Sequence, residues 1–218
     1  MMKIQSWHVK NCLIPLSLSL LLLVCSCTLD SAQRALFRDN FDDPDGEWGT
    51  EADKEFGRGY ETGEYFIELK ELNWFAWATP GQNFSDLSVE VKAYLSSGSQ
   101  DNHFGILCRH ADLENFYYFA ISADGYYAIF QRVDGGGLEA LTADGEGMIH
   151  SPAIRTGKQV NALRAVCQGK KLSFYVNGEL LETVTDETHT RGDAGIGAGS
   201  GAEGEVRIQF DDFVVAEP

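Results

Sequence analysis

Residues 171–184 read KLSFYVNGELLETV, in which Asn177-Gly178 separates two apolar runs. Asn-Gly between such runs is the strongest short-range signal of a β-hairpin, because both residues tolerate the positive φ of a tight turn. Upstream, residues 84–95 read FSDLSVEVKAYL, and every second residue from Leu87 to Leu95 is apolar. This alternation is typical of a half-buried strand. The two stretches predict antiparallel β-structure.

The same pattern continues in both directions from this hairpin. Three strand-like runs at 103–109, 115–122 and 125–133 follow one another as a meander, and EVRIQFDDFVV at 205–215 is the last strand. Turn signals separate these runs, and the chain from Cys27 on has no amphipathic helical pattern and no Pro-rich or Gly/Ser linker. We therefore predict one all-β domain over residues 36–218. Its architecture is an antiparallel sandwich of about a dozen strands in two sheets packed face to face.

Composition agrees with this fold class and excludes several functions. The 218 residues are 44% hydrophobic and 11% aromatic, which argues against disorder. The 23 glycines begin only at Gly46 and favour turns and short strands. From Cys27 on, the chain has 15 basic and 33 acidic residues, a formal charge of −18. Such a chain repels phosphates and anionic headgroups, so we expect no nucleic acid partner and no membrane binding through charge.

The first 26 residues form a lipoprotein signal peptide in our interpretation. Lys3 and Lys10 give a weak positive start, and 12–24 is an apolar stretch too short for a comfortable membrane span. The segment ends in Val-Cys-Ser-Cys, which resembles a bacterial lipobox with Cys27 as the lipidated residue. Residues 27–35 are then a tether. The alternatives are an ordinary secretory signal and an uncleaved anchor, and all three place the domain outside the cytoplasm.

Two cysteines remain after this segment, in an oxidising compartment. Cys108 and Cys167 each lie in mid-strand, on the face that their apolar neighbours share. We predict a disulfide between them, since a metal site would need further His or Cys nearby. The alternative is two buried free thiols that act as small hydrophobic residues.

The order of the motifs resembles the concanavalin A-like lectin/glucanase superfamily. The resemblance rests on FRDNFDDP at 37–44, FSDLSVEV at 84–91, the meander within 101–130, NALRAVCQGKKLSFYVNGELL at 161–181 and the closing FDDFVV. Within that superfamily, the chain is most similar to extracytoplasmic modules classed with the 3-keto-disaccharide hydrolase domain. The resemblance implies a jelly roll of the laminin-G-like type. It leaves the activity open, because the superfamily includes lectins, hydrolases and interaction modules.

The glycine-rich segment GDAGIGAGSG at 192–201 is not a phosphate loop, since no Lys-Ser/Thr and no helix follow it. Gly195, Gly197 and Gly199 recur with period two, so one face of this strand has no side chains. We expect another part of the protein, or less often a ligand, to approach the backbone there.

Catalytic signals are weak. Residues 51–55, EADKE, superficially resemble the E-x-D-x-E strand of retaining glucanases, but the alternate positions are Ala52 and Lys54 rather than core residues. His103 and His110 bracket one strand about 23 Å apart and cannot share a site within it. We therefore assign no catalytic residue.

Aromatic residues on the central strands favour sugar binding, because flat rings suit the apolar C–H faces of sugars. Strand alternation turns about half of these rings inward. The residues that we expect to contact a ligand are the outward rings and their polar neighbours: Trp74, Tyr94, Tyr118 and Tyr126, with Asp101, Asn102, Arg109 and Asn115.

The two ends of the domain are acidic and should lie side by side in this fold. If Phe37 and Phe41 face the core, so does Asp39, and the same parity applies to Asp212 near the C-terminus. Buried carboxylates need partners or a metal, so we predict a structural Ca²⁺ held by some of Asp39, Asp42 and Asp212. The alternative is that a β-bulge or backbone N–H groups satisfy them.

The function that these observations favour is a non-catalytic carbohydrate-binding module, attached outside the cytoplasm to the bacterial membrane through Cys27. Its partner is a glycan or a surface protein. The alternatives are an interaction or structural sandwich without a sugar site and a glycan-directed hydrolase.

Overall fold

The computed structural model describes residues 34–145 and 147–218. The predicted signal peptide, Cys27 and most of the predicted tether lie outside the described residues. The described part contains sixteen strands, of which thirteen have four or more residues, and a single 3-10 turn, η1 (Ala143–Gly145), but no α-helix. None of its segments forms a helix long and apolar enough to span a membrane. The predicted all-β class is confirmed.

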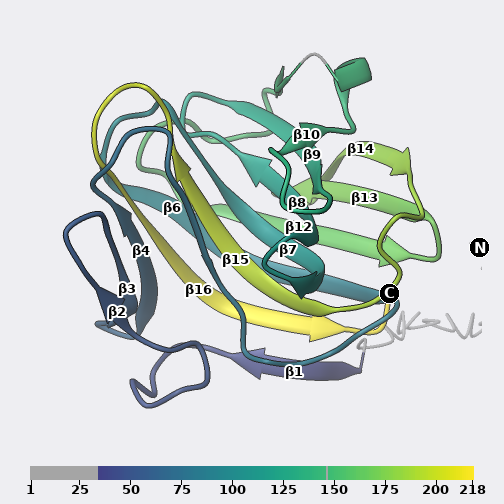
Figure 1. Ribbon diagram of the computed structural model, residues 1–218, viewed down its shortest axis with the longest axis horizontal. Helices are drawn as coiled ribbons and strands as arrows, with labels where there is room; N and C mark the ends of the chain where they lie inside the picture. The colour runs from purple at the N-terminus through teal and green to yellow at the C-terminus, as the bar shows by residue number, and fades with distance from the viewer. Residues whose placement is uncertain (1–33, 146) are drawn as a thin grey trace, which may run out of the picture. The chain divides into compact units, whose positions relative to one another are not determined.

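Two antiparallel sheets pack face to face (Figure 1). Sheet A has the order β14-β13-β12-β6-β16-β4-β3-β2, with β1 paired to β16. Its strands are β1 (Ala35–Asp39), β2 (Glu51–Ala52), β3 (Phe56–Glu61), β4 (Glu64–Leu69), β6 (Leu87–Gly98), β12 (Asn161–Gln168), β13 (Lys171–Val176), β14 (Glu179–Thr185) and β16 (Val206–Ala216).

Sheet B has the order β10-β9-β8-β7-β15-β5, with β11 paired to β9. Its strands are β5 (Phe75–Ala78), β7 (Asn102–Asp112), β8 (Asn115–Ile121), β9 (Tyr126–Arg132), β10 (Glu139–Ala140), β11 (Ile149–His150) and β15 (Asp193–Ser200). The predicted meander is β7-β8-β9. The predicted hairpin in sheet A is β13-β14, in which Val176 pairs with Glu179 across Asn177-Gly178.

The core lies between the sheets and is built from alternate residues of both inner faces, because successive side chains of a strand point to opposite sides. On β6, Leu87, Val89 and Val91 are buried, whereas Glu90 and Lys92 are exposed. Cys108 of β7 and Cys167 of β12 form the predicted disulfide, which joins sheet B to sheet A through this core.

A second, smaller apolar layer covers the outer face of sheet B. Leu107, Phe116, Tyr118 and Ala120 are fully buried there. Their cover comes in part from side chains that lie across the glycine face of β15. A Cβ on Gly197 would fall 2.8 Å from Leu107 Cδ1 and 3.1 Å from Phe75 Cζ. The close approach to this bare strand therefore comes from neighbouring strands.

The two acidic ends lie side by side, as predicted. β1 pairs with the last residues of β16, and Asp39 is opposite Phe213 (Figure 1). The Asp39 side chain turns toward the core, where Trp48 Nε1 donates to Oδ2 at 2.9 Å and Phe41 N donates to Oδ1 at 2.7 Å. Asp212 does not follow the predicted parity. The register of β16 shifts between Asp211 and Val214, and Asp212 has a φ of 53°, so a bulge turns it outward.

Candidate functional site

An aromatic groove lies along β5, the strand that ends the order of sheet B. We call it the edge groove, and its volume is about 240 Å³. It is lined by Glu51, Phe56, Arg58, Trp74, Phe75, Ala76, Trp77 and Leu113. Trp74 directly precedes β5, and the other residues come from β5, from β2 and β3 of sheet A, and from the β7–β8 turn. The groove therefore forms where the edges of the two sheets meet.

Some side chains of the edge groove are exposed to solvent, and others are held in a fixed orientation. Trp74 is 41% exposed and Leu113 is 67% exposed, so both present apolar surface to solvent. Phe75 and Trp77 project from the same face of β5 and stack with centroids 5.3 Å apart. The Trp77 indole Nε1 donates a hydrogen bond to His110 Nε2 at 3.0 Å. This bond fixes the orientation of the Trp77 ring.

Charged groups lie beside these rings. Arg58 Nη1 donates to the Trp77 backbone carbonyl, and Nη2 lies 3.3 Å from Glu51 Oε2. The pair is partly exposed, with side-chain exposures of 27% for Arg58 and 49% for Glu51. Such a pair contributes little stability, but it offers both donors and acceptors to a ligand that contacts the rings.

The acidic segment 51–55 does not form one strand face. β2 ends at Ala52, and the Asp53 carboxylate accepts hydrogen bonds from the backbone N–H groups of Glu55 and Phe56, at 2.9 and 2.8 Å. These bonds lower the pKa of Asp53, the one from Phe56 most. Of the three acids in the segment, only Glu51 lines the edge groove.

A second pocket of about 240 Å³, the rim pocket, lies at the β7 start and the β8–β9 turn. It contains three of the predicted ligand residues, Asp101, Asn102 and Tyr126, and is completed by Ser122, Asp124 and Met148. Asn102 is already engaged, since its side chain donates to Ser99 O and accepts from Ala123 N. The 39% exposed Tyr126 ring is the main apolar surface of this pocket.

The rim pocket and Trp74 lie at the same end of sheet B. Trp74 N donates to Ser200 Oγ at 3.0 Å, and Ser200 pairs with Asn102 across β15 and β7. The structure therefore places Trp74, Asp101, Asn102 and Tyr126 at one end of sheet B, but only the last three share a pocket.

The other four predicted ligand residues lie elsewhere. Tyr94 is on the outer face of sheet A, where its hydroxyl donates to Glu64 Oε2 at 2.9 Å, and burial raises its pKa to about 12. Tyr118 is on the outer face of sheet B as expected, but the second apolar layer buries it completely. Asn115 bonds to Asp112 within the β7–β8 turn.

Arg109 departs most from the prediction that it flanks a ligand. It is 1% exposed, and its guanidinium donates to Ser85 O, His189 O and Asp86 Oδ1 at 2.9, 2.9 and 3.1 Å. The register of β7 shifts after Cys108, and Arg109 has a φ of 52°, so its side chain leaves the outer face. It connects loops instead of facing solvent.

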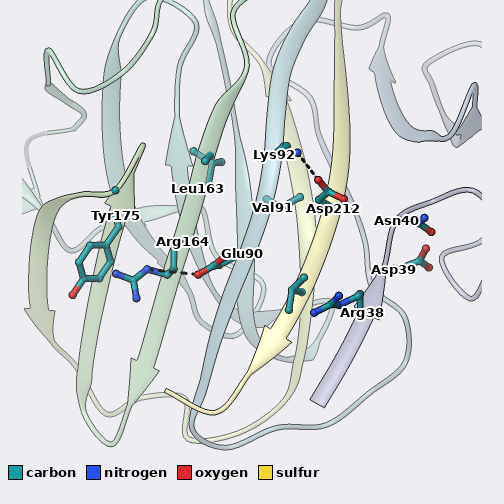
Figure 2. A pocket seen from close by; sticks show the side chains of 13 residues that line it. Arg38, Asp39, Asn40, Glu90, Val91, Lys92, Leu163, Arg164, Tyr175 and Asp212 are labelled. Atoms are coloured by element: carbon teal, nitrogen blue, oxygen red, sulfur yellow. Dashed lines mark hydrogen bonds and ion pairs between the residues drawn. The ribbon is translucent and has the colours of Figure 1, made fainter. Parts of the chain in front are cut away.

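Another groove, of about 470 Å³, lies on the outer face of sheet A (Figure 2). Its charged side chains largely neutralise one another: Lys92 Nζ is 2.5 Å from Asp212 Oδ2, and Arg164 Nε is 3.9 Å from Glu90 Oε1. The Arg164 guanidinium also lies 3.8 Å from the centre of the Tyr175 ring. Tyr175 is the one aromatic ring among the described residues that line this groove, and the guanidinium already covers it, so the groove offers little to the face of a sugar.

The proposed calcium ligands do not form one site. Asp39 is satisfied by Trp48 and Phe41, Asp42 Oδ2 accepts from Asn40 Nδ2 at 2.6 Å, and Asp212 pairs with Lys92. Across residues 34–145 and 147–218, no three His, Cys, Asp or Glu side chains are placed to hold a metal ion. The residues present therefore do not fit a calcium ion at this place.

Two partly or fully buried histidines belong to the aromatic layer around the edge groove. Burial lowers the pKa of His103 to about 4, and its Nδ1 lies 3.2 Å from the Tyr118 hydroxyl. Burial also lowers the pKa of His110. Both imidazoles are thus neutral at pH 7, and His110 can accept the Trp77 N–H.

Sequence reasoning missed Arg58 and Leu113 as groove residues and treated Glu51 only as a weak catalytic candidate. Of the three groove rings at 74–77, the predicted ligand set included Trp74 but neither Phe75 nor Trp77. Strand alternation indicates that Trp77 lies on the face of β5 opposite to Ala76 and Ala78. The convergence of β2, β3 and the β7–β8 turn on β5 had no signal in the sequence.

No family model and no curated protein matches the chain in sequence. Solved structures do match in fold. Carbohydrate-binding module CBM66 from Bacillus subtilis is 16% identical, with a TM-score of 0.56 over 79% of this chain and 96% of that one. A Bacillus subtilis protein of unknown function with a galectin-like fold is 12% identical, with a TM-score of 0.60 over 85% and 97%.

A glycoside hydrolase matches equally well. The β-glucanase from Bacillus licheniformis is 13% identical, with a TM-score of 0.59 over 84% of this chain and 97% of that one. At these identities the matches show the fold alone, an antiparallel jelly-roll sandwich of two sheets. They do not show the finer resemblance to 3-keto-disaccharide hydrolase modules.

Proposed function

We propose that this protein is a non-catalytic carbohydrate-binding module, held outside the cytoplasm by a lipid on Cys27, and that a glycan binds in the edge groove. The observation that carries the proposal is the convergence of exposed Trp74 and the stacked Phe75–Trp77 pair with the Arg58–Glu51 ion pair. Flat rings bind the apolar faces of pyranoses, and adjacent charged groups bind their hydroxyls.

The carboxylates of the groove support binding rather than hydrolysis. Glycosidases of the common type place two carboxyl groups on either side of the scissile bond. Glu51 is the only carboxylate among the described residues that line the edge groove, and it faces Arg58. Fold neighbours named as a carbohydrate-binding module and as a glucanase are compatible with either activity. The choice of binding over hydrolysis therefore rests on the residues that line the edge groove, not on the fold neighbours.

A glycan array probed with the full-length protein in detergent tests the proposal. We expect retention of one or more glycans, and Trp74→Ala should weaken binding roughly tenfold, or about 1.4 kcal/mol. Tyr175→Ala is the matched control, because it removes a half-buried ring from the outer face of the other sheet. No retention of any glycan would favour a protein-interaction sandwich, and release of reducing sugar would favour a hydrolase.

The lipid anchor needs a separate test. The proposal rests on the lipobox-like Val-Cys-Ser-Cys and on the apolar segment before it. Cys27→Ser should release the protein from the membrane fraction or block its processing, whereas Cys25→Ser should leave both unchanged. Unchanged membrane association of Cys27→Ser would contradict the anchor without affecting the glycan proposal.

A further inference from the structure

The orientation of one groove ring depends on a histidine that does not line the groove. Trp77 Nε1 donates to His110 Nε2 at 3.0 Å, and an indole N–H can only donate. His110 Nε2 must therefore carry a lone pair, and the proton of the neutral ring is on Nδ1. The bond exists only while His110 is uncharged.

Apolar rings hold the imidazole in this place. It stacks on Phe116 of β8 with centroids 5.6 Å apart and an interplanar angle of 25°, and it lies 6.0 Å from the Trp77 ring. Burial among these rings lowers the pKa of His110. A second cation would also be poorly placed here, because Arg132 of β9 lies 6.0 Å from the Trp77 ring and 5.9 Å from the Phe116 ring.

Other charged groups near His110 are already engaged. Asp112, two residues along the chain, accepts from Glu114 N at 2.8 Å and from Asn115 Nδ2 at 3.0 Å. Asp193 of β15 pairs with His110 in register, but its carboxylate accepts from Gly81 N and Ala194 N. Arg58 of β3 donates to the Trp77 carbonyl and pairs with Glu51. Asp112 favours an imidazolium at His110, but burial among the rings opposes the charge more strongly.

We propose that His110 is the positioning residue for Trp77, and that its protonation releases the indole and disassembles the aromatic wall of the edge groove. The Phe75–Trp77 stack then loses the bond that orients its second ring. The consequence for glycans rests on the proposed function: the groove binds at neutral pH and loses its ligand in mild acid. The release of Trp77 itself does not depend on any ligand.

The direct test uses the free full-length protein in detergent, with ¹⁵N-labelled indoles. The sequence has four tryptophans, and Trp77→Phe identifies the Trp77 signal. We expect that signal to shift between pH 7.5 and 4.5 with a midpoint below 6.5, the usual pKa of histidine. His110→Gln places an amide oxygen near the position of Nε2 and does not titrate, so it should keep the neutral-pH signal throughout. His110→Phe keeps the ring but should show the released signal at every pH.

His150→Gln is the matched control, since His150 is an exposed histidine that contacts Tyr126 at the other end of β9. It should leave the Trp77 titration unchanged. The inference is overturned if the Trp77 signal does not move in the wild type, or if it moves equally in His110→Gln. Repeating the glycan array at pH 7.5 and 5.0 then tests the consequence. Absence of all binding would reject the proposed function, while the indole titration still decides the role of His110.

Discussion

The imidazole of His103 lies directly on the backbone of Gly199, in the adjacent strand. A Cβ on Gly199 would fall 2.1 Å from His103 Nε2 and from His103 Cε1. Gly199→Ala must therefore displace a ring that Phe75 and Tyr118 hold in the second apolar layer. We expect a loss of roughly 3 kcal/mol, at the upper end for overpacking. Urea unfolding of both proteins measures it.

Gly137→Ala is the matched control for this substitution. A Cβ on Gly137 would meet no atom within 4 Å, and its φ is not in the left-handed region. Its free energy of unfolding should stay within about 0.5 kcal/mol of the wild-type value. Equal effects of the two substitutions would contradict the close packing on β15.

Arg109 is predicted to stabilise the fold and to make no contact with the glycan. Arg109→Ala leaves the carbonyls of Ser85 and His189 without the guanidinium donor, whereas Asp86 Oδ1 keeps its bond from Gly169 N. Leaving a buried carbonyl without its donor typically costs about 1 to 3 kcal/mol, whereas the half-exposed Asp86 carboxylate stays solvated. Arg164→Ala should cost less than about 1 kcal/mol, because that side chain is half-buried and its nearest Glu90 oxygen is 3.9 Å away. Comparable losses in the two variants would contradict this assignment.

The disulfide should be a major source of stability. Cys108 and Cys167 are 59 residues apart, and closing a loop of that length is worth about 4 kcal/mol in the chain-entropy model. Reduction, or replacement of both residues by alanine, should lower the unfolding midpoint accordingly. Peptide mapping after thiol labelling of the unfolded, unreduced protein should find neither cysteine modified. Labelling of both would show that the bond does not form.

Acid should weaken the fold through His103. Burial lowers its pKa to about 4, whereas an unfolded histidine has a pKa near 6.5. The unfolded chain therefore binds a proton that the folded chain excludes. The corresponding stability is fully present above pH 6.5 and is lost as the pH falls toward 4, by about 3 kcal/mol. In His103→Phe this part of the pH dependence should disappear, which a series of urea titrations from pH 7 to 4 would show.

Calcium should not stabilise the protein specifically. Asp39, Asp42 and Asp212 each have a different hydrogen-bond or ion-pair partner. Melting curves in EDTA, in excess calcium and in magnesium at equal ionic strength should therefore coincide. A rise seen only with calcium, and abolished by Asp212→Ala, would restore the site that the sequence suggested.

Local alternation explains why so much of the fold could be predicted. The positions of Leu87 to Leu95, the Asn177-Gly178 turn and the shared inward parity of Cys108 and Cys167 each follow from strand periodicity over a few residues. The prediction that β1 and β16 are adjacent came from resemblance to a known fold and was also confirmed.

Bulges and long-range convergence explain what could not be predicted. Asp212 and Arg109 both have a positive φ at a register shift. At such a bulge the side chain points to the opposite side from the one that strict alternation predicts. The edge groove could not be predicted for another reason. Arg58 reaches Trp77 across the gap between two sheets, and nothing in the sequence near either residue indicates that meeting.

The position of the last two strands has a consequence for how the chain acquires its structure. β16 lies between β6 and β4, and β15 lies between β7 and β5. An interior strand of each sheet is therefore supplied by residues after Gly192. Until those residues are available, β6 and β7 each have an unpaired edge, and such edges readily pair with other chains. Pairings so distant in sequence also form slowly. Neither sheet can therefore be completed until nearly the whole chain is available, and intermediates that lack β15 and β16 expose strand edges that are prone to aggregation.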